Sequence, residues 1–283
     1  MKRTRGPRKA SQGTDTPAGS LNRAVTLLET IAQGPPEGCD MTDLVARTSL
    51  PRPTVYRVLE MLMMLGWVSR DAKTRRFNLG ADLAALGYSA ISRHPLERSA
   101  AGTLSALAEK INQVVYMSVR SGLDFVCVGR YESASQIQVG RGWAGMRGPF
   151  GMTPACLGMF AAMPPEQVRD LITLSMPRYR RIEGFDEKGF RQSLAQSMDA
   201  GYGIYGNIVL DRTTSGLGVA IRDPSGYPIA GIGTTFITGW LDEAETERCV
   251  AAMTKAAEDI ERRLFLPAPA PKAGKAGSAS QRR

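Results

Sequence analysis

The sequence predicts an α+β protein in two parts, a small helical segment followed by a larger segment of helices and strands. In the first third, apolar residues recur about every 3.6 residues, and two short strands follow the helices directly. In the later part, several strands are joined by short glycine-containing turns, which favour antiparallel pairing. Helices mixed with hairpin-joined strands predict an antiparallel sheet covered by helices.

Residues 41–65 form the most informative segment, because they predict two short helices joined by a tight turn. The first helix covers residues 42–48, residues 49–51 form the turn, and the second helix begins near Pro53. One face of the second helix is apolar, through Val55, Val58, Leu59 and Leu62. The residues of its first turns that lie off this apolar face, and are therefore free to contact another molecule, are Arg52, Pro53, Thr54, Tyr56 and Arg57. Such a helix suits the major groove of DNA, although a purely structural helical hairpin would show the same pattern.

The next segment predicts a β-hairpin beside this helix pair. Residues 67–70 and 76–79 have the composition of strands, and residues 71–75 connect them. Three basic residues crowd the tip of the hairpin, namely Lys73, Arg75 and Arg76. An ordinary solvated turn could carry the same charge, but the adjacent helix pair favours contact with DNA phosphates.

These segments resemble the IclR family of bacterial transcription regulators. Residues 20–29 resemble the first helix of that family, residues 50–59 its recognition helix, and residues 65–80 its wing. The resemblance continues, more loosely, to about Leu266. It implies an effector-responsive regulator that binds double-stranded operator DNA as a homodimer or a dimer of dimers.

The resemblance also implies an order of domains along the chain. We expect a disordered basic tail (1–19), a winged helix-turn-helix (20–80), a linker helix (81–95), an effector-binding domain (96–266) and a disordered tail (267–283). By resemblance, the linker helix helps to pair two subunits, whereas a helix packed wholly within its own chain is the alternative.

The larger domain is predicted to alternate between helices and strands. Helices are expected at 96–111, 154–162, 165–174, 186–200 and 242–265. Strands are expected at 114–119, 125–128, 137–139, 204–209, 216–221 and 229–236. The last helix has acidic residues in its first turn and arginines near its end, as the helix dipole favours.

Charge is distributed unevenly along the chain. Residues 1–93 contain 14 Lys and Arg against 8 Asp and Glu, a net charge of +6. Residues 94–266 have a net charge of −1 and residues 267–283 one of +4. Positive charge therefore gathers on the predicted DNA-binding third and on the two ends of the chain, as an electrostatic contact with phosphates would require. The basic amino terminus lacks a following apolar stretch, and no apolar run reaches transmembrane length, so we expect a cytoplasmic protein without a membrane partner.

Motifs of enzymes and metalloproteins are weak in this sequence. His94 is the single histidine, which argues against a histidine-based triad or metal site. Residues 201–206 match G-x-G-x-x-G, but a helix precedes them and a strand follows, the reverse of a dinucleotide site. We therefore expect no catalytic residue, metal or cofactor. The competing hypothesis is a small-molecule-binding or catalytic protein whose amino-terminal domain binds another protein.

The effector site is predicted where the loop 146–153 enters the helix that begins near Pro154. Free N–H groups and the dipole at a helix start suit a carboxylate. The candidate binding residues are Met146, Arg147, Met152, Thr153, Pro154, Ala155, Cys156, Thr234 and Thr235, and Phe150 and Leu157 are expected to add apolar walls. A glycine-rich turn, a solvated arginine and strand-favouring threonines would give the same pattern without a site.

This combination suits a small organic acid with an apolar body, for which an aromatic carboxylate is one candidate. The family resemblance also points to small carboxylic metabolites and to control of their catabolism. The acidic residues that many family members carry after Gly-Tyr are absent from 204–209, so the identity of the effector stays open.

Overall fold

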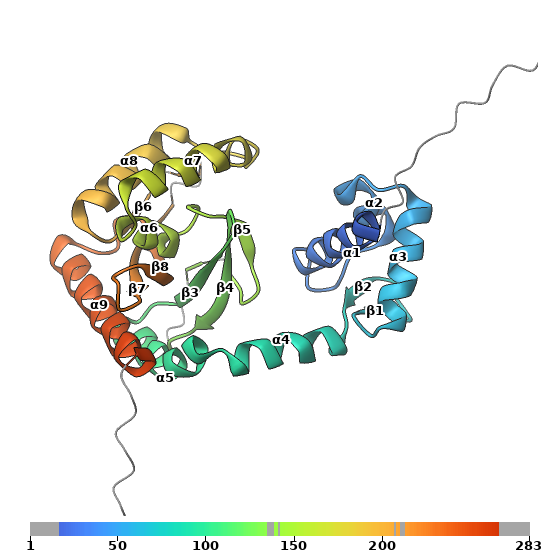
Figure 1. Cartoon of the computed structure of the whole chain (residues 1–283), viewed down its shortest axis with the longest axis horizontal. Coiled ribbons are helices and arrows are strands. Elements are labelled where there is room, and N and C mark those ends of the chain that lie inside the picture. The colour runs from blue at the N-terminus through green and yellow to red at the C-terminus, as the bar shows by residue number, and fades with distance from the viewer. Residues whose placement is uncertain (1–16, 135–138, 141, 207, 210–212, 266–283) are drawn as a thin grey trace, which may run out of the picture. The chain divides into compact units, whose positions relative to one another are not determined.

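A computed structural model describes residues 17–134, 139–140, 142–206, 208–209 and 213–265. The chain divides into two compact units, and the boundary between them falls between Arg93 and His94 (Figure 1). Among the described residues, no helix is both long and apolar enough to cross a membrane.

The first unit consists of three helices, a two-stranded hairpin and a fourth helix. In chain order these are α1 (Pro17–Ala32), α2 (Met41–Thr48), α3 (Arg52–Met64), β1 (Val68–Arg70), β2 (Phe77–Leu79) and α4 (Ala81–Arg93). Asp40 begins α2 with a capping box, since its side chain accepts from the Thr42 and Asp43 N–H groups at 2.7 and 2.9 Å. Ser49 ends α2 in the left-handed conformation, at φ 54°, which turns the chain sharply into α3.

The core of the first unit joins all three of the leading helices to the hairpin. Its largest fully buried side chains are Leu27 of α1, Leu44 of α2, Leu59 of α3 and Phe77 of β2. The predicted apolar face of α3 is buried, because Val55, Val58, Leu59 and Leu62 are at most 3% exposed. The sequence pattern therefore places α3 with one face fixed in the core and its other faces outward.

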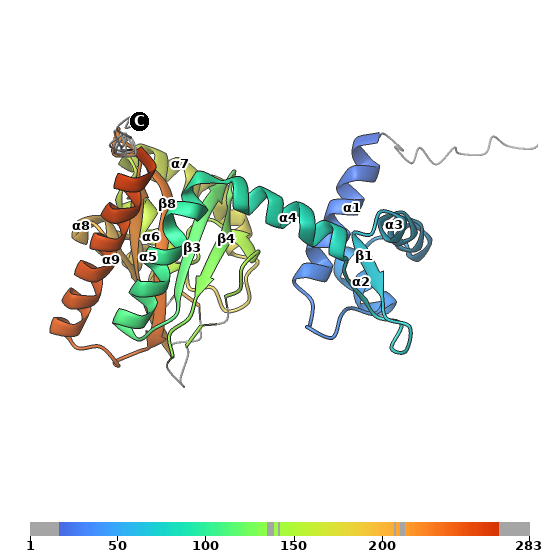
Figure 2. The same cartoon turned by 90° about the horizontal axis from the view of Figure 1, so that it is seen from below.

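The second unit is built on an antiparallel sheet with strand order β5-β4-β3-β8-β7-β6. Its strands are β3 (Val115–Ser121), β4 (Asp124–Tyr131), β5 (Arg147–Pro149), β6 (Gly203–Tyr205), β7 (Thr214–Arg222) and β8 (Pro228–Ile237). Its helices are α5 (Pro95–Ile111), α6 (Pro154–Ala161), α7 (Pro165–Tyr179), α8 (Glu187–Ala200) and α9 (Glu243–Phe265). Helices α5 and α9 lie side by side against the sheet (Figure 2).

The two faces of this sheet are covered in different ways. Large side chains point from one face toward α5 and α9 and form one apolar core with those helices. Examples are Val115, Met117 and Ile232. On the opposite face, α6 lies directly over glycines of β7 and β8. A Cβ on Gly218 would lie 1.9 Å from the Pro154 carbonyl oxygen, and one on Gly231 would lie 2.3 Å from that of Ala155. Helix α6 can approach this closely only because these strand positions have no side chain.

The structure confirms the predicted α+β class with an antiparallel sheet. Several boundaries of helices and strands, however, differ from those predicted. Strand β5 was not predicted, and the predicted strand 204–209 ends at Tyr205. Helix α7 runs past residue 174 to Tyr179, with Pro177 inside its last turn. The predicted strand 137–139 lies outside the described residues except for Val139, which belongs to no strand, and α1 already begins within the predicted tail 1–19.

Candidate functional site

Helix α3 presents a row of exposed side chains at its start. Arg52, Pro53 and Arg57 are exposed, Tyr56 is 52% exposed, and Thr54 is half-buried. Pro51 precedes the helix and Pro53 lies in its first turn, where a missing N–H costs no helical hydrogen bond. The core-facing residues hold the helix firmly, so these side chains project into solvent from a rigid support.

The hairpin tip carries Lys73 and Arg75 exposed to solvent. Asp71 closes the turn, because its carboxylate accepts from the Lys73 and Thr74 N–H groups at 3.0 and 2.6 Å. The hydrogen bond from Thr74 is the main cause that lowers the pKa of Asp71. Arg75 adopts φ 61°, a left-handed conformation that is rare outside glycine.

Arg76 does not lie at the tip with the other two basic residues. Its guanidinium turns back, donates to the Gly38 carbonyl oxygen at 2.9 Å and lies 3.7 Å from the Glu37 carboxylate. The side chain is therefore half-buried and tied to the loop before α2. Lys73 and Arg75 remain as the exposed cations of the predicted trio.

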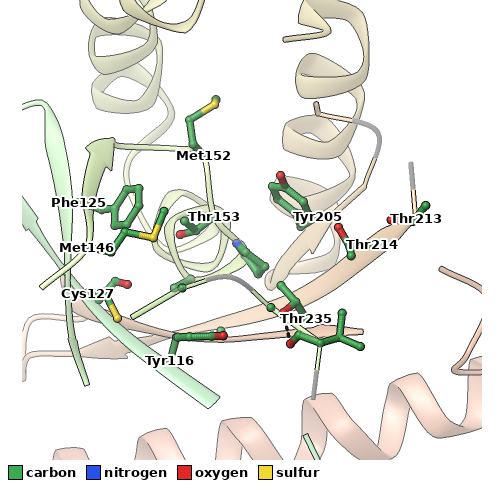
Figure 3. A pocket seen from close by; sticks show the side chains of 17 residues that line it. Tyr116, Phe125, Cys127, Met146, Met152, Thr153, Tyr205, Thr213, Thr214 and Thr235 are labelled. Carbon is green, nitrogen blue, oxygen red and sulfur yellow. Dashed lines mark hydrogen bonds between the residues drawn. The ribbon is translucent and has the colours of Figure 1, made fainter. Parts of the chain in front are cut away.

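The second unit contains a cavity of about 520 Å³ at the start of α6 (Figure 3). Its lining comes from β3, β4 and β8, from the loops before β5 and α6, from the first turn of α6, and from β6 and β7. The lining residues with side chains are Tyr116, Ser118, Phe125, Cys127, Val139, Met146, Met152, Thr153, Pro154, Ala155, Tyr205, Thr213, Thr214 and Thr235. None of the described lining residues carries a charged side chain.

The start of α6 gives this cavity an electropositive edge. Thr153 is the N-cap, and its hydroxyl accepts from the Cys156 N–H at 3.3 Å. Pro154 occupies the first helical position, where its lost N–H had no intrahelical partner. The dipole and the N–H groups of a helix start attract anions, so this edge suits the carboxylate of a ligand.

Six of the nine predicted effector residues line the cavity, namely Met146, Met152, Thr153, Pro154, Ala155 and Thr235. The Thr235 hydroxyl donates to the Val139 carbonyl oxygen at 3.0 Å. The loop 146–153 and the strand that contains Thr235 were predicted from the sequence as separate segments. The folded sheet brings them together around the cavity.

Arg147, Cys156 and Thr234 are not among the residues that line the cavity. Arg147 lies on β5, and its Nε donates to Asp124 Oδ2 at 2.8 Å, while Arg178 lies 2.5 Å from the other oxygen of Asp124. Cys156 is fully buried, and burial raises the pKa of its thiol to about 11. Thr234 points to the opposite face of the sheet from Thr235, because side chains alternate along a strand. Its hydroxyl donates to the Val114 carbonyl oxygen at 2.8 Å.

The two further apolar walls expected from the sequence also belong elsewhere. Phe150 is 1% exposed and packs edge-on against Phe160, with ring centroids 4.9 Å apart. Leu157 is fully buried in the same core. Both side chains hold α6 and α7 together beside the cavity instead of facing a ligand.

Most of the cavity residues that the sequence did not single out come from strands or lie beside them, and Val139, Gly140 and Gly142 come from the loop before β5. On β3 they are Tyr116 and Ser118, on β4 Phe125 and Cys127, and around β6 and β7 Tyr205, Thr213 and Thr214. Burial raises the pKa of the Cys127 thiol to about 11, so it stays neutral at physiological pH. Alternation along β3 could have identified Tyr116 and Ser118 as facing away from Val115 and Met117.

The features that suggested other chemistry have structural roles. Gly201 ends α8 in the left-handed conformation, and the following glycine begins β6, so the glycine motif is a turn. His94 precedes α5 as its N-cap residue. In the part of the chain that the structure describes, no three His, Cys, Asp or Glu side chains cluster as metal ligands would.

A helix-turn-helix with a β-hairpin, joined along one chain to an α+β unit with a cavity, defines a DNA-binding transcriptional regulator. Two family models match the chain, the IclR helix-turn-helix domain over residues 20–72 and the carboxy-terminal domain of bacterial IclR transcriptional regulators over residues 88–262. The chain therefore belongs to the IclR family of bacterial transcriptional regulators.

Individual relatives agree with this assignment. The chain is 24% identical over 224 residues to the regulator KdgR of Dickeya chrysanthemi, covering 78% of this chain and 72% of that protein. It is 23% identical over 220 residues to the Pca regulon regulatory protein of Pseudomonas putida, covering 77% and 75%.

Solved structures show the same fold. An IclR regulator from Alicyclobacillus acidocaldarius superimposes with a TM-score of 0.72 at 18% identity, covering 87% of this chain and 98% of that one. An IclR homologue from Microbacterium hydrocarbonoxydans, crystallised with 4-hydroxybenzoate, gives a TM-score of 0.67 at 20% identity, covering 87% and 98%.

Proposed function

We propose that this regulator controls genes for the catabolism of a small organic acid, which binds in the cavity at the start of α6 and changes affinity for operator DNA. The observation that carries the proposal is the cavity itself. It has apolar walls and a helix start at one edge, and none of its lining residues that the structure describes has a charged side chain. An aromatic acid is the first class to test, because a homologue of the same fold was crystallised with 4-hydroxybenzoate. The protein acts in the cytoplasm, where bacterial DNA is found.

DNA binding by a homodimer, or by a dimer of dimers, is part of the proposal. Two recognition helices related by a two-fold axis match a two-fold operator. Helix α4 supports a subunit contact, since Leu86 is 54% and Tyr88 74% exposed. Apolar side chains that stay exposed on a helix are suited to being buried against a second copy of the same protein.

The DNA-binding surface is tested by two substitutions with different expected effects. Arg57→Ala should relax base discrimination and cost roughly 1–3 kcal/mol of specific binding if Arg57 reads a base edge. Arg75→Ala should weaken binding to all sequences alike and reduce the salt slope by about 1, because it removes one phosphate contact. Gel shifts on promoter DNA over a range of salt concentrations measure both effects.

Lys255→Ala is the matched control, because it removes an exposed cation from α9 in the other unit. If Arg57→Ala and Arg75→Ala bound DNA as tightly as Lys255→Ala, the assignment of α3 and the hairpin to DNA contact would be wrong.

The effector is tested by calorimetry of the full chain with a panel of aliphatic and aromatic acids, followed by gel shifts with each acid that binds. A ligand can change operator affinity only if it binds one arrangement of the protein more tightly than another. We expect at least one monocarboxylic acid to bind and to shift the operator affinity. An acid that binds without changing operator affinity would contradict the switching mechanism, and binding restricted to neutral or cationic compounds would contradict the carboxylate.

A further inference from the structure

Strand β4 directs two side chains of the same strand to opposite faces of the sheet. Cys127 lines the cavity (Figure 3), whereas Tyr131, four residues later, packs into the core that includes α5 and α9. On a regular strand, residues four apart lie on the same face. The register explains the difference, because Cys127 and Gly129 pair with neighbouring residues of β3 and leave Val128 as an extra residue. Strand β4 therefore has a β-bulge, which turns the following side chains to the other face.

The bulge is bonded to the cavity wall through Cys127. The Cys127 thiol donates to the Gly129 carbonyl oxygen at 3.4 Å, across the extra residue. Gly129 also leaves room for Tyr131, because a Cβ there would lie 2.6 Å from the Tyr131 hydroxyl oxygen. A molecule that packs against Cys127 in the cavity therefore acts on a side chain whose hydrogen bond spans the bulge.

Tyr131 connects the bulge to the first turn of α5. Its hydroxyl donates to Glu97 Oε1 at 3.1 Å, and Glu97 is half-buried. Burial raises the pKa of the Glu97 carboxyl, and the bond from Tyr131 opposes this shift by favouring the ionised form. Helix α5 begins at Pro95, two residues after Arg93, where the first unit ends. The bond therefore holds the part of the second unit that the chain joins directly to the DNA-binding unit.

A second hydrogen bond reaches the first half of α5 without any connection to the cavity. Arg263 of α9 donates to the Thr103 hydroxyl at 2.8 Å. Neither residue is among the described residues that line the cavity. Both bonds hold α5, but only the bond from Tyr131 continues along β4 to the cavity wall.

We propose that Tyr131 and Glu97 transmit effector binding from the cavity to the start of α5, and that the bulge of β4 is the segment that changes. A ligand packed against Cys127 alters the bulge, the bulge moves Tyr131, and the start of α5 follows through Glu97. Coupling requires an element with two arrangements that both sites bias, and here these are the Tyr131–Glu97 bond made and the bond broken.

Tyr131 and Glu97 are positioning residues in this proposal, because neither is among the described residues that line the cavity. The inference rests on the proposed function, since it names the residues through which a ligand in the cavity changes operator affinity.

The first experiment measures gel shifts on promoter DNA with benzoate, with 4-hydroxybenzoate and with each acid of the panel that binds the full chain. In the wild type, we expect the acid to change operator affinity about fivefold or more. Tyr131→Phe and Glu97→Ala should each reduce this change to less than about twofold, although calorimetry still detects binding of the acid. Glu97→Gln keeps an acceptor for the Tyr131 hydroxyl, so it should keep the change.

Thr103→Val is the matched control, because it removes the other hydrogen bond to α5. We expect it to lower the melting temperature about as much as Tyr131→Phe and to keep the effect of the acid on operator affinity. Thermal unfolding also shows whether each variant folds, and Glu97→Ala removes the same bond from the other side if Tyr131→Phe does not fold.

The second experiment needs no effector, because coupling between two sites is reciprocal. Promoter DNA should change the backbone hydrogen exchange of residues 124–131 in the wild type by about threefold or more. Tyr131→Phe should abolish this change, and Thr103→Val should keep it. Mass spectrometry of the full chain with and without promoter DNA measures the exchange.

The inference is overturned if promoter DNA leaves the exchange of residues 124–131 unchanged in the wild type. It is also overturned if Tyr131→Phe and Thr103→Val reduce the effect of the acid equally. In either case, an acid that shifts the operator affinity of the wild type still supports the proposed function. If no acid of the panel binds, the proposed function fails, and hydrogen exchange alone decides whether the bulge of β4 is coupled to DNA binding.

Discussion

The two faces of the sheet in the second unit differ in what separates the strands from the helices. On the face toward α5 and α9, side chains such as Ile232 and Met253 fill the whole space and are fully buried. On the other face, glycines let the backbone of α6 approach the backbone of β7. The first arrangement gives a continuous apolar core, and the second gives close contact at one place and a cavity next to it.

This difference shows how one sheet can support both stability and binding. Alternation along β8 sends Ile232 and Thr234 to the core face and Gly233 and Thr235 to the cavity face. Stability should therefore depend mainly on the first set, and ligand binding on the second. Substitutions on neighbouring residues of a single strand can separate the two properties.

The largest effect is expected on the filled face. Ile232→Ala should destabilise the protein by roughly 2–5 kcal/mol, because it removes a fully buried side chain and leaves a cavity among close-packed neighbours. Urea unfolding measures the loss, and ligand affinity of the folded fraction should change little. A loss below about 0.5 kcal/mol, the range of ordinary surface substitutions, would contradict the comparison.

A smaller effect is expected where α6 contacts the glycines. Gly218→Ala places a Cβ where the Pro154 carbonyl oxygen now lies 1.9 Å away, so α6 must shift at a cost of roughly 1–3 kcal/mol. Since the start of α6 forms one edge of the cavity, ligand affinity should fall together with the melting temperature. Both are measured on the same preparation, by thermal unfolding and calorimetry.

The control for this substitution is Gly102→Ala in α5. A Cβ there would meet nothing within 4 Å, and alanine favours helix, so stability should rise by about 0.5–1 kcal/mol. If Gly218→Ala were as well tolerated as Gly102→Ala, the close approach of α6 to β7 would not be required for stability or for ligand binding.

The smallest effects should distinguish two adjacent threonines. Thr234→Val removes a buried hydrogen bond to the Val114 carbonyl oxygen, so it should cost about 1 kcal/mol of stability without changing ligand affinity. Thr235→Val should cost less stability, since this residue is half-buried, but it should weaken ligand binding because Thr235 lines the cavity. Paired unfolding and calorimetry measurements test this, and the reverse result would contradict the alternation.

The sequence predicted the first unit better than the cavity, and the reason is physical. The four apolar residues of α3 lie within two turns of one helix, so their spacing alone identifies the buried face and thus the exposed Arg52, Tyr56 and Arg57. Arg76 escaped this reasoning because its partner, the Gly38 carbonyl oxygen, lies 38 residues earlier in the chain. Local periodicity carries no information about such a contact.

The cavity depends on which strands are neighbours. The loop into α6 was predicted from its own residues, through the glycines and Pro154, but Tyr116 and Ser118 join it only because β3 pairs with β8. The residues 231–233 read simply as a strand, whereas their glycines determine how near α6 lies. Thr234 and Thr235 could not be told apart until the face of β8 toward α6 was known. Strand order and register are long-range properties that a single sequence specifies weakly.

The left-handed backbone of Arg75 has a consequence for the design of the hairpin. A side chain at φ 61° costs roughly 1–2 kcal/mol relative to glycine, which adopts this conformation freely. Glycine at this position should therefore give a hairpin that resists heat and denaturant better and holds DNA less well. The tip therefore carries an exposed charge at a position where glycine would be more stable, and selection for thermostability alone would tend to remove that charge.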